Sequence, residues 1–547
     1  MSPMLAVAVD AVRVPAQPAG ILVMAAVLLP LAGAAVAVLT HGHVRVQRAI
    51  SLTTAAAAAI SGIALLRHVA VHGTVVVQAG GWPAPYGISF VVDRLSAVMV
   101  AVGAVMVAIV LLYSIGLLEE RTERLFFHPI YLVLGAGVSA AFVTGDLFNL
   151  FVAFEVMLIA SYVLLTLGAT KPQIRAGMTY VVINLVASTL FVVGVALLYA
   201  STGSVSMADL AVKVADLPPG LRDAIGVLFL VTFGIKAGLF PLFFWLPDAY
   251  PTAPSPITAV FAGLLTKVGV YAIIRTQTLL FAPADGGAST LLLAVAGATM
   301  VVGVLGAVAQ TDIKRILSFH IVSQIGYMIL GLALFSLAGL AGAILYVVHH
   351  IVVKTALFCV GGAVEHRWGT SRLDDLGGVG RHAPLLAVLF GVAALALAGI
   401  PPFSGFVAKV ALVTAALAGG HYAVVTAALV VSVLTLYSMT KIWAGAFWGQ
   451  SPEDEPPPGD EPPPGDDATP GAHPVAAGGL ATVVAPPTRG AAVPKPMLLA
   501  TSLLVALSIG IAANAEAIHR YSAEAATELL DPAIYVDAVT TASERAR

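Results

Sequence analysis

The sequence predicts an all-α polytopic membrane protein, and its composition and its hydrophobic segments carry that prediction. Of the 547 residues, 59% are hydrophobic and only 10% are charged, and the mean hydropathy is +0.97. Soluble domains are about 25% charged, and no soluble fold buries so large an excess of apolar surface. Apolar segments of about 20 residues, the length that crosses a bilayer, recur along the chain.

We count about fourteen predicted spans, two of which are broken helices. The seventh is interrupted at Pro241 and the twelfth at Pro401 and Pro402, because proline removes a main-chain donor and ends a helix. The spans lie near residues 20–39, 48–66, 95–117, 129–145, 147–168, 176–200, 223–244, 256–277, 290–309, 315–335, 338–362, 384–418, 421–446 and 497–514.

Two further segments have a character of their own. Residues 74–92 place two β-branched runs on either side of Gly80 and Gly81, which predicts a hairpin. Residues 451–496 are rich in proline and acid and cannot bury a core, so we expect a disordered linker. The predicted parts of the chain are a tail (1–19), spans one to three (20–128), a five-helix unit (129–277), a second such unit (290–446), the linker (451–496), the last span (497–514) and a tail with a short surface helix (515–547).

The distribution of lysine and arginine orients the predicted spans. If the N-terminus lies outside, most of these bases fall in inner loops, and an even number of spans places both termini outside. The hairpin then lies on the outer face and the linker on the inner face. Arg275 is assigned to an outer loop and Lys314 to an inner loop. The bases left inside predicted spans are Lys236, Lys267, Lys354 and Lys409.

The two broken spans indicate an internal duplication. Spans four to eight and nine to thirteen form two consecutive five-helix units, and such units have opposite orientations in the membrane. The fourth member of the first unit carries Lys236 and the break at Pro241, and the fourth member of the second carries Lys409 and the break at Pro401. Paired interrupted helices in inverted repeats point to the ion site of a transporter.

Glu155 and Lys236 are predicted to form an acid–lysine pair. Glu155 is the only carboxylate deep in a predicted span. An opposite charge keeps both groups ionised, and loosening the pair lets desolvation remove the lysine proton. The pair is therefore a candidate switch for proton transfer. The alternative is a protonated carboxyl group that only bonds to a neighbouring helix.

Lysine and histidine residues extend this pattern along the second half of the chain. Lys267 lies mid-span with Tyr271 four residues later on the same face, where the alternative is a lysine that snorkels to the interface. His349, His350 and Lys354 follow on one span and form a candidate proton relay. The alternatives for the histidines are a hydrogen-bonded role in the core and a role as haem ligand. His320 and Gln324 are a further candidate pair for the relay. Lys409 lies beside the second break and is the last candidate; the alternative is that it only binds the carbonyl groups freed by the break.

Other chemistries find no support in the sequence. There is no nucleotide-binding loop, zinc pattern or nucleophile triad, and the single cysteine, Cys359, cannot form an internal disulfide or hold an iron–sulfur cluster. We therefore expect no metal and no cofactor. A net charge of −2 gives no reason to expect nucleic acid as a partner.

Four long runs resemble the antiporter-like subunits of proton-pumping complexes. These runs are DLFNLFVAFEVMLIASYVLL (146–165), GIKAGLFPLFFWLPDAYPTAPSPITAVFAGLLTKVGVYAIIR (234–275), DIKRILSFHIVSQIGYMILG (312–331) and GIPPFSGFVAKVALV (399–413). Within that superfamily the chain most resembles the D subunit of the Mrp-type cation/proton antiporters. The membrane-arm subunits of respiratory complex I and of membrane-bound hydrogenases are the alternative.

The resemblance implies a fourteen-helix fold with two inverted five-helix repeats and broken seventh and twelfth helices. It implies that Glu155 and Lys236 form the family's acid–lysine pair, that Lys267 and Lys409 are its central and terminal lysines, and that the helix with His349, His350 and Lys354 links them. It also implies a bacterial cell membrane, Na⁺ and H⁺ as transported ions, other membrane subunits as partners and no redox cofactor.

Overall fold

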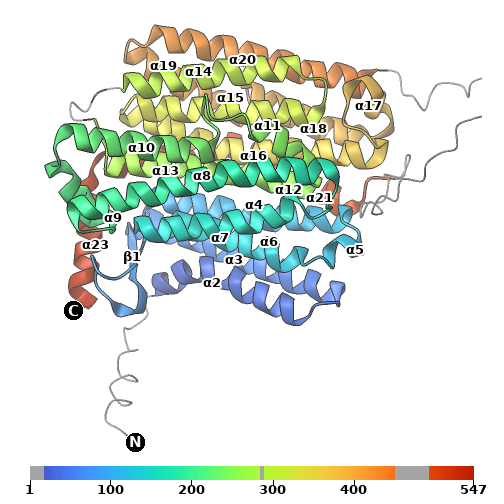
Figure 1. The fold of residues 1–547 in the computed structure, drawn as a ribbon. Coiled ribbons are helices and arrows are strands. Elements are labelled where there is room, and N and C mark those ends of the chain that lie inside the picture. The colour runs from blue at the N-terminus through green and yellow to red at the C-terminus, as the bar shows by residue number, and fades with distance from the viewer. Residues whose placement is uncertain (1–17, 284–286, 288, 450–491, 547) are drawn as a thin grey trace, which may run out of the picture.

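The protein is a bundle of long helices that run side by side along one direction (Figure 1). A computed structural model describes residues 18–283, 287, 289–449 and 492–546. Within those ranges, eleven helices are long and apolar enough to cross a membrane, which confirms the predicted all-α polytopic fold. Predictions for residues 1–17 and for most of the linker at 451–496 lie outside the described residues.

The helices follow the predicted spans closely. They are α2 (Pro18–Leu39), α3 (Val44–His72), α4 (Arg94–Leu117), α5 (Glu120–Glu123), α6 (Phe127–Val143), α7 (Leu147–Leu165), α8 (Lys171–Thr202), α9 (Met207–Lys213), α10 (Pro219–Ala237), α11 (Leu246–Ala249), α12 (Ser255–Val260), α13 (Thr266–Leu279), α14 (Thr290–Ala309), α15 (Ile313–Ala333), α16 (Leu337–Trp368), α17 (Val379–His382), α18 (Pro384–Ala398), α19 (Ser404–Ala418), α20 (Tyr422–Ile442), α21 (Lys495–Ala513), α22 (Ala515–Leu530) and α23 (Pro532–Ala546).

Three predicted spans correspond to shorter or divided helices. The fourth is α6, the seventh begins with α10, and the twelfth is divided into α18 and α19. Helix α12 continues through a π-helical stretch, Phe261–Leu265, into α13. The total of fourteen spans and the two inverted repeats stay predictions.

The two breaks share one local geometry. Helix α10 ends at Gly238 and α18 at Gly399, and both glycines are left-handed, with φ of 79° and 85°. In each case the residue after the glycine donates a hydrogen bond to the carbonyl five residues earlier, Leu239 to Gly234 and Ile400 to Leu395. This is the Schellman type of helix end. Proline follows within three residues of each glycine, so neither helix can resume at once.

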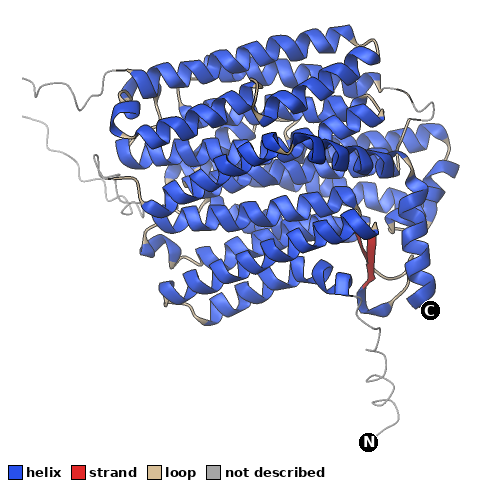
Figure 2. Ribbon diagram, turned by 180° about the vertical axis from the view of Figure 1, so that it is seen from behind, coloured by secondary structure: helices blue, strands red, loops and turns tan. Residues whose placement is uncertain are grey.

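One end of the bundle carries the predicted hairpin, and we call it the hairpin end. Strand β1 (Val75–Gln78) pairs antiparallel with β2 (Ser89–Val92), which confirms the predicted hairpin (Figure 2). The C-terminal helices lie at the same end (Figure 1). The prediction of a single short surface helix there is wrong: two helices form, and α22 buries Ala525, Ala526 and Leu529 against the bundle.

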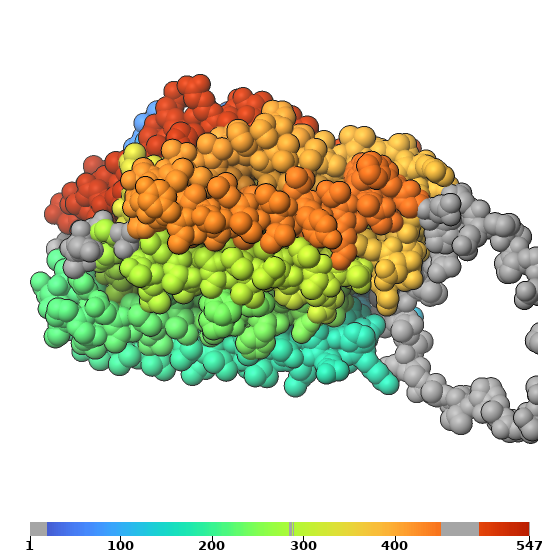
Figure 3. Space-filling view, turned by 90° about the horizontal axis from the view of Figure 1, so that it is seen from above, coloured from blue at the N-terminus to red at the C-terminus, as the bar shows by residue number. Residues whose placement is uncertain are grey.

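Burial separates the helices into an inner and an outer group. The apolar windows of α12–α13 and α16 are wholly surrounded by other helices, whereas α2, α3, α8, α14 and α20 expose most of theirs. Figure 3 looks down on α20 and α14 at the outer edge of the bundle. Exposed leucine and valine side chains on the outer helices suit contact with lipid. The inner helices are where ionisable side chains can be kept away from lipid.

Close helix packing depends on glycine, and this predicts a stability effect. A Cβ added to Gly303 of α14 would overlap the main-chain nitrogen of Ser323 on α15, whereas one added to Gly297 would meet only a Val424 methyl at 3.9 Å. Gly303→Ala should therefore cost about 1–3 kcal/mol of stability by forcing the helices apart. Thermal unfolding of the purified protein in detergent measures this, with Gly297→Ala as the control. Equal midpoints for the two variants would contradict the packing.

Candidate functional site

Glu155 and Lys236 are joined through a serine. The Lys236 ammonium, on the last turn of α10, donates to the hydroxyl of Ser188 on α8 at 3.2 Å, and that hydroxyl donates to the Glu155 carboxylate on α7. No ion pair joins Glu155 and Lys236 directly in the described part of the chain. The ammonium also lies 4.9 Å from the ring centre of Phe154. Glu155, Ser188 and Lys236 therefore form one short hydrogen-bonded connection from carboxylate to lysine.

Sequence reasoning missed Ser188. Its signal is weak but present: Asn184 and Ser188 are spaced by four in an otherwise apolar span, so both face the same side of α8. Both are buried, in contrast to the exposed leucine and valine residues around them. Two polar side chains on the same face of an apolar span indicate that this face points inward, and this signal could have identified Ser188 as the partner of Lys236.

Lys267 lies just after the π-helical stretch and is completely buried. Its ammonium donates to the carbonyl of Ala262, within that stretch. A π-helical turn breaks the regular hydrogen-bond ladder and is frequent at functional sites. The next turn brings α13 close to α10, because a Cβ on Gly269 would lie 2.7 Å from the nitrogen of Ala237. Lys267 is therefore held beside the helix end that carries Lys236.

Helix α16 carries three buried ionisable groups through the middle of the bundle. Lys354 donates to the carbonyl of Leu317 on α15 at 3.2 Å. The Nδ1 atom of His349 lies 2.7 Å from the hydroxyl of Ser404 at the start of α19. Neither ring nitrogen of His350 has a hydrogen-bond partner among the described residues. Unpaired polar atoms in a protein interior cost free energy. The ring nitrogens of His350 are therefore positions that can bind a proton or a water molecule.

The second half of the site surrounds the break between α18 and α19. Lys409 donates to the carbonyl of Ala398, the last residue of α18, at 2.9 Å, and lies 5.0 Å from the ring centre of Tyr327. This contact is the one expected if the lysine binds a carbonyl freed by the break. His320 contacts Ser438 at 2.5 Å, and Gln324 accepts from Tyr346 of α16.

These groups are close enough for their charges to act on one another. Lys267 interacts electrostatically with His350 and Lys354, and Lys409 interacts with His349 and His320. Glu155 likewise acts on Lys236. These interactions, together with the close packing of α10 against α13, connect the predicted residues from α7 to α19, and each lysine has a hydroxyl or carbonyl oxygen as its acceptor.

Two basic residues were wrongly placed by the sequence prediction. Arg275 was assigned to a loop, but it lies within α13, is 3% exposed, and pairs with Asp93 at 2.7 Å. Lys314 was also assigned to a loop, but it is buried at the start of α15 and pairs with Glu365 at 2.8 Å. Both residues lie within a few positions of a helix end, where hydropathy alone cannot decide between loop and span.

Tyr271 faces the Arg275 cluster. Its hydroxyl donates to the carbonyl of Phe142 at 2.9 Å and lies 2.9 Å from the hydroxyl of Ser96. Lys267, Tyr271 and Arg275 are spaced by four on one helix face, so Tyr271 lies between the lysine and the arginine.

The described residues contain no cluster of three or more histidine, cysteine, aspartate or glutamate side chains that could hold a metal ion. Cys359 is buried with a free thiol, and the hydroxyl of Tyr113 donates to its carbonyl at 2.7 Å. The lysine, histidine, carboxyl and hydroxyl groups of the candidate residues can transfer protons among themselves.

Comparison with known proteins places this geometry in a family. Residues 144–435 match the model for the membrane domain of NADH:quinone oxidoreductase and Mrp antiporters. The chain is 44% identical over 519 residues to the D subunit of the Na⁺/H⁺ antiporter of Alkalihalophilus pseudofirmus, covering 95% of this chain and 99% of the relative. It is 37% identical over 515 residues to the corresponding D subunit of Bacillus subtilis, covering 94% and 98%.

A solved structure of the Mrp complex from a Dietzia species contains a chain with a TM-score of 0.83 and 36% identity, covering 95% of this chain and 99% of that one. A chain of respiratory complex I from Thermus thermophilus has the same fold, with a TM-score of 0.73 and 24% identity, covering 93% and 100%. The chain therefore belongs to the D-subunit family of Mrp-type Na⁺/H⁺ antiporters, a multi-pass branch of the wider family that includes the membrane domain of NADH:quinone oxidoreductase.

Proposed function

We propose that this chain is the proton-translocating subunit of a multisubunit Na⁺/H⁺ antiporter of a bacterial cell membrane. The observation that carries the proposal is the line of buried titratable groups on the inner helices. A charged lysine in a membrane-spanning helix costs about 2.5–3.5 kcal/mol on insertion scales. A chain that places four such lysines in one bundle, along with the buried His320, His349 and His350, supports a role in ion movement rather than in folding.

Glu155, Ser188 and Lys236 act as the switch at the start of the path. The Glu155 carboxylate attracts the Lys236 ammonium, and the Ser188 hydroxyl connects the two. A change that separates them leaves the lysine in a desolvated site, where the neutral amine is favoured and the proton is released. The released proton passes to Lys267, which the close contact of α13 and α10 holds nearby.

From Lys267 the proton moves along α16 to Lys409. His350 has free ring nitrogens between Lys267 and Lys354, and His349 connects α16 to Ser404 at the second break. A histidine can accept a proton on one ring nitrogen and release another from the second, which suits it to this step. Lys409 terminates the line at the carbonyl of Ala398.

The surroundings of the chain follow from the same proposal. The chain assembles with the other membrane subunits of an Mrp-type complex, which exchanges Na⁺ for H⁺. Both termini lie outside, so the hairpin end is the outer face and the linker end the inner face. Bacterial relatives that match over 94% or more of this chain support this assignment to a cell-membrane complex.

A second candidate function is a proton-pumping subunit of a redox complex, such as complex I or a membrane-bound hydrogenase. The shared fold of the complex I chain is the observation that favours it. Identification of the copurifying subunits by mass spectrometry separates the two. Small antiporter subunits support the proposal, and quinone-reductase or hydrogenase subunits support the second candidate.

Removing either end of the acid–lysine switch should stop transport. Lys236→Ala and Glu155→Ala are expected to abolish sodium-driven proton flux in vesicles, because each removes a group that holds or releases the proton. Both complexes should still assemble, as judged by copurification of the partner subunits. Full antiport in both variants would contradict the switch, and loss of assembly in both would indicate that these residues only hold helices together.

The hydroxyl of Ser188, which connects Glu155 to Lys236, should be needed for a normal rate of antiport. Ser188→Ala removes a hydrogen bond to charged groups, worth about 1.5–3 kcal/mol, so antiport should slow roughly tenfold or more. Ser188→Thr retains the hydroxyl and should keep most of the activity. Ser201→Ala, on the exposed face of the same helix, is the matched control. Normal transport by Ser188→Ala would show that Glu155 and Lys236 communicate without the hydroxyl.

Lys409 should matter for transport beyond its carbonyl contact. Lys441, in the last turn of α20, also donates to main-chain carbonyls, those of Val308 at 3.1 Å and Gln310 at 2.8 Å. Lys409→Gln is expected to abolish antiport, and Lys441→Gln to preserve it, in the same vesicle assay. If both variants transport normally, Lys409 only satisfies the helix break.

A further inference from the structure

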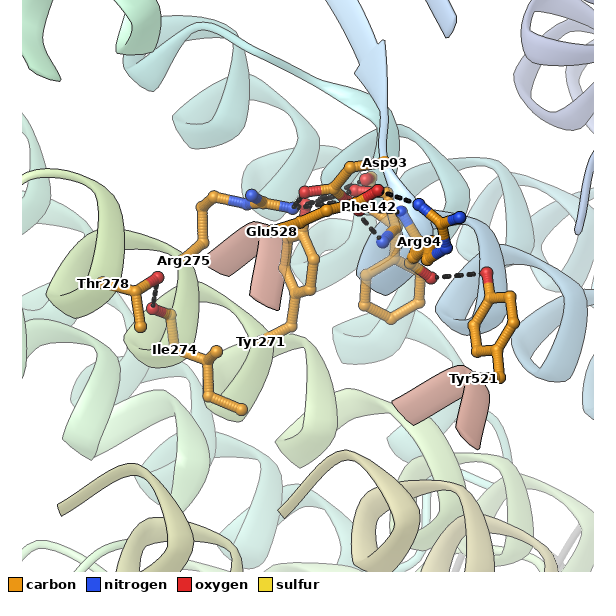
Figure 4. Close-up of polar contacts among 10 residues, drawn as sticks. Asp93, Arg94, Phe142, Tyr271, Ile274, Arg275, Thr278, Tyr521 and Glu528 are labelled. Carbon is orange, nitrogen blue, oxygen red and sulfur yellow. Dashed lines mark hydrogen bonds and ion pairs between the residues drawn. The ribbon is translucent and has the colours of Figure 1, made fainter. Parts of the chain in front are cut away.

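A buried ion pair lies at the hairpin end of α13 (Figure 4). The Arg275 guanidinium donates to both carboxylate oxygens of Asp93, at 2.8 and 2.7 Å, and the two side chains are only 3% and 5% exposed. Asp93 also caps α4, since it accepts from the main-chain nitrogen of Ser96 at 2.9 Å. The carboxylate is therefore fixed at the junction of α4 and α13.

Two hydroxyl groups lie on the side of this pair that faces the proposed proton path. The Ser96 hydroxyl lies 3.3 Å from Arg275 and 2.9 Å from the hydroxyl of Tyr271. Tyr271 is one helical turn from Arg275 and one turn from Lys267, on the same face of α13. Hydroxyl groups can accept one proton while donating another, so they can connect Asp93 to the turn that carries Lys267.

A cavity lies beside Arg94, the residue that follows Asp93 in the chain. This cavity, of about 490 Å³, is lined by Gly73, Thr74, Arg94, Glu524, Thr527, Glu528, Ile534 and Ala538. Arg94 follows Asp93 directly and is held by α22: it pairs with Glu528 and Glu524, and its carbonyl accepts from Tyr521 at 2.9 Å. Helix α23 places Tyr535 over the Arg275 guanidinium, 5.2 Å from the ring centre. A hollow with two carboxylates thus opens beside Arg94, the next residue after Asp93.

We propose that Asp93 is the carboxylate that exchanges protons between this cavity and the path at Lys267, and that Arg275 is its positioning residue. This role rests on the proposed function. A proton from water in the cavity binds an Asp93 carboxylate oxygen, which weakens the attraction to Arg275. Asp93 then gives up a proton toward the Ser96 and Tyr271 hydroxyls, each of which receives one proton and releases one, and water carries the last proton from Tyr271 to the neutral Lys267 amine, whose own acceptor is the carbonyl of Ala262. Asp93 returns to the carboxylate form and pairs with Arg275 again.

The pair is poorly explained as a stabilising contact alone. Removing two charges from water costs about as much as their attraction returns, so apolar side chains would join α4 to α13 at least as well. The charged and titratable groups that act on this site are Tyr271, Arg94, Tyr521, Glu528, Tyr535 and Asp146. Burial raises the pKa of Glu528, the carboxyl group of the cavity nearest this site. Protons are therefore retained at the mouth of the cavity more readily than on a free glutamate.

The test uses the purified complex in proteoliposomes, with sodium-driven proton flux followed by a pH-sensitive dye. Asp93→Asn keeps the shape of the side chain but cannot carry the proton, so flux should fall roughly tenfold or more. Asp93→Glu should retain most of the flux. Arg275→Gln should move the pH profile of antiport to higher pH, because a proton on Asp93 is held more tightly without the guanidinium. Arg275→Lys should leave the profile near that of the native complex.

The matched control is an ion pair with a buried carboxylate among the N-terminal helices. Arg48 contacts Glu123 at 2.8 Å, and the Glu123 side chain is fully buried among the N-terminal helices. Glu123→Gln should leave flux unchanged in complexes of normal composition. If Asp93→Asn transports normally, if Asp93→Glu loses flux as Asp93→Asn does, or if the Arg275→Gln profile does not move, the proposal is overturned and the pair serves only helix docking. Lys236→Ala, run in parallel, separates the two proposals: its normal flux would contradict the proposed function itself.

Discussion

The structure depends on one constraint: a positive charge inside a membrane-spanning bundle must be surrounded by protein and must have an acceptor. The lysines of the proposed path meet it in the same way. Each is buried, and each donates to a hydroxyl or a main-chain carbonyl of a nearby helix segment. None of them has a carboxylate within ion-pair distance among the residues that the structure describes. An acceptor without a full negative charge holds a proton loosely, which suits a group that must release it.

Interrupted helices supply two of those acceptors. In a regular helix the inner carbonyl groups already accept the hydrogen bonds of the helix itself, whereas a break leaves carbonyl groups free for a buried lysine. The π-helical stretch before Lys267 provides the carbonyl of Ala262, and the end of α18 at Gly399 provides that of Ala398. The glycine and proline residues that break α18 therefore prepare the binding position of Lys409. Glycine and proline also end α10 directly after Lys236, so both breaks in the bundle have the same type of helix end next to a buried lysine.

Much of this could be predicted from the sequence. Hydropathy located the spans, proline located both breaks, and lysine stood out because it is so costly in an apolar segment. Ser188 could not be found in that way, because a serine is tolerated in any span and only the positions of α7 and α10 make it a bridge. Arg275 was misplaced because it lies at the end of a span. The packing of α22 and α23 on the hairpin end depends on contacts between segments over 400 residues apart, such as Tyr521 with Arg94.

In the proposed mechanism, protons cross the bundle along one unbroken line of titratable groups. Lys267 is the position to interrupt, since it lies between the switch at Lys236 and the relay on α16. Sodium-driven proton flux should be measured in proteoliposomes that contain the complex with Lys267→Met, whose subunit composition is checked on the same sample. We expect flux to be lost while the complex stays intact. Flux at the native rate through an intact Lys267→Met complex would contradict the mechanism.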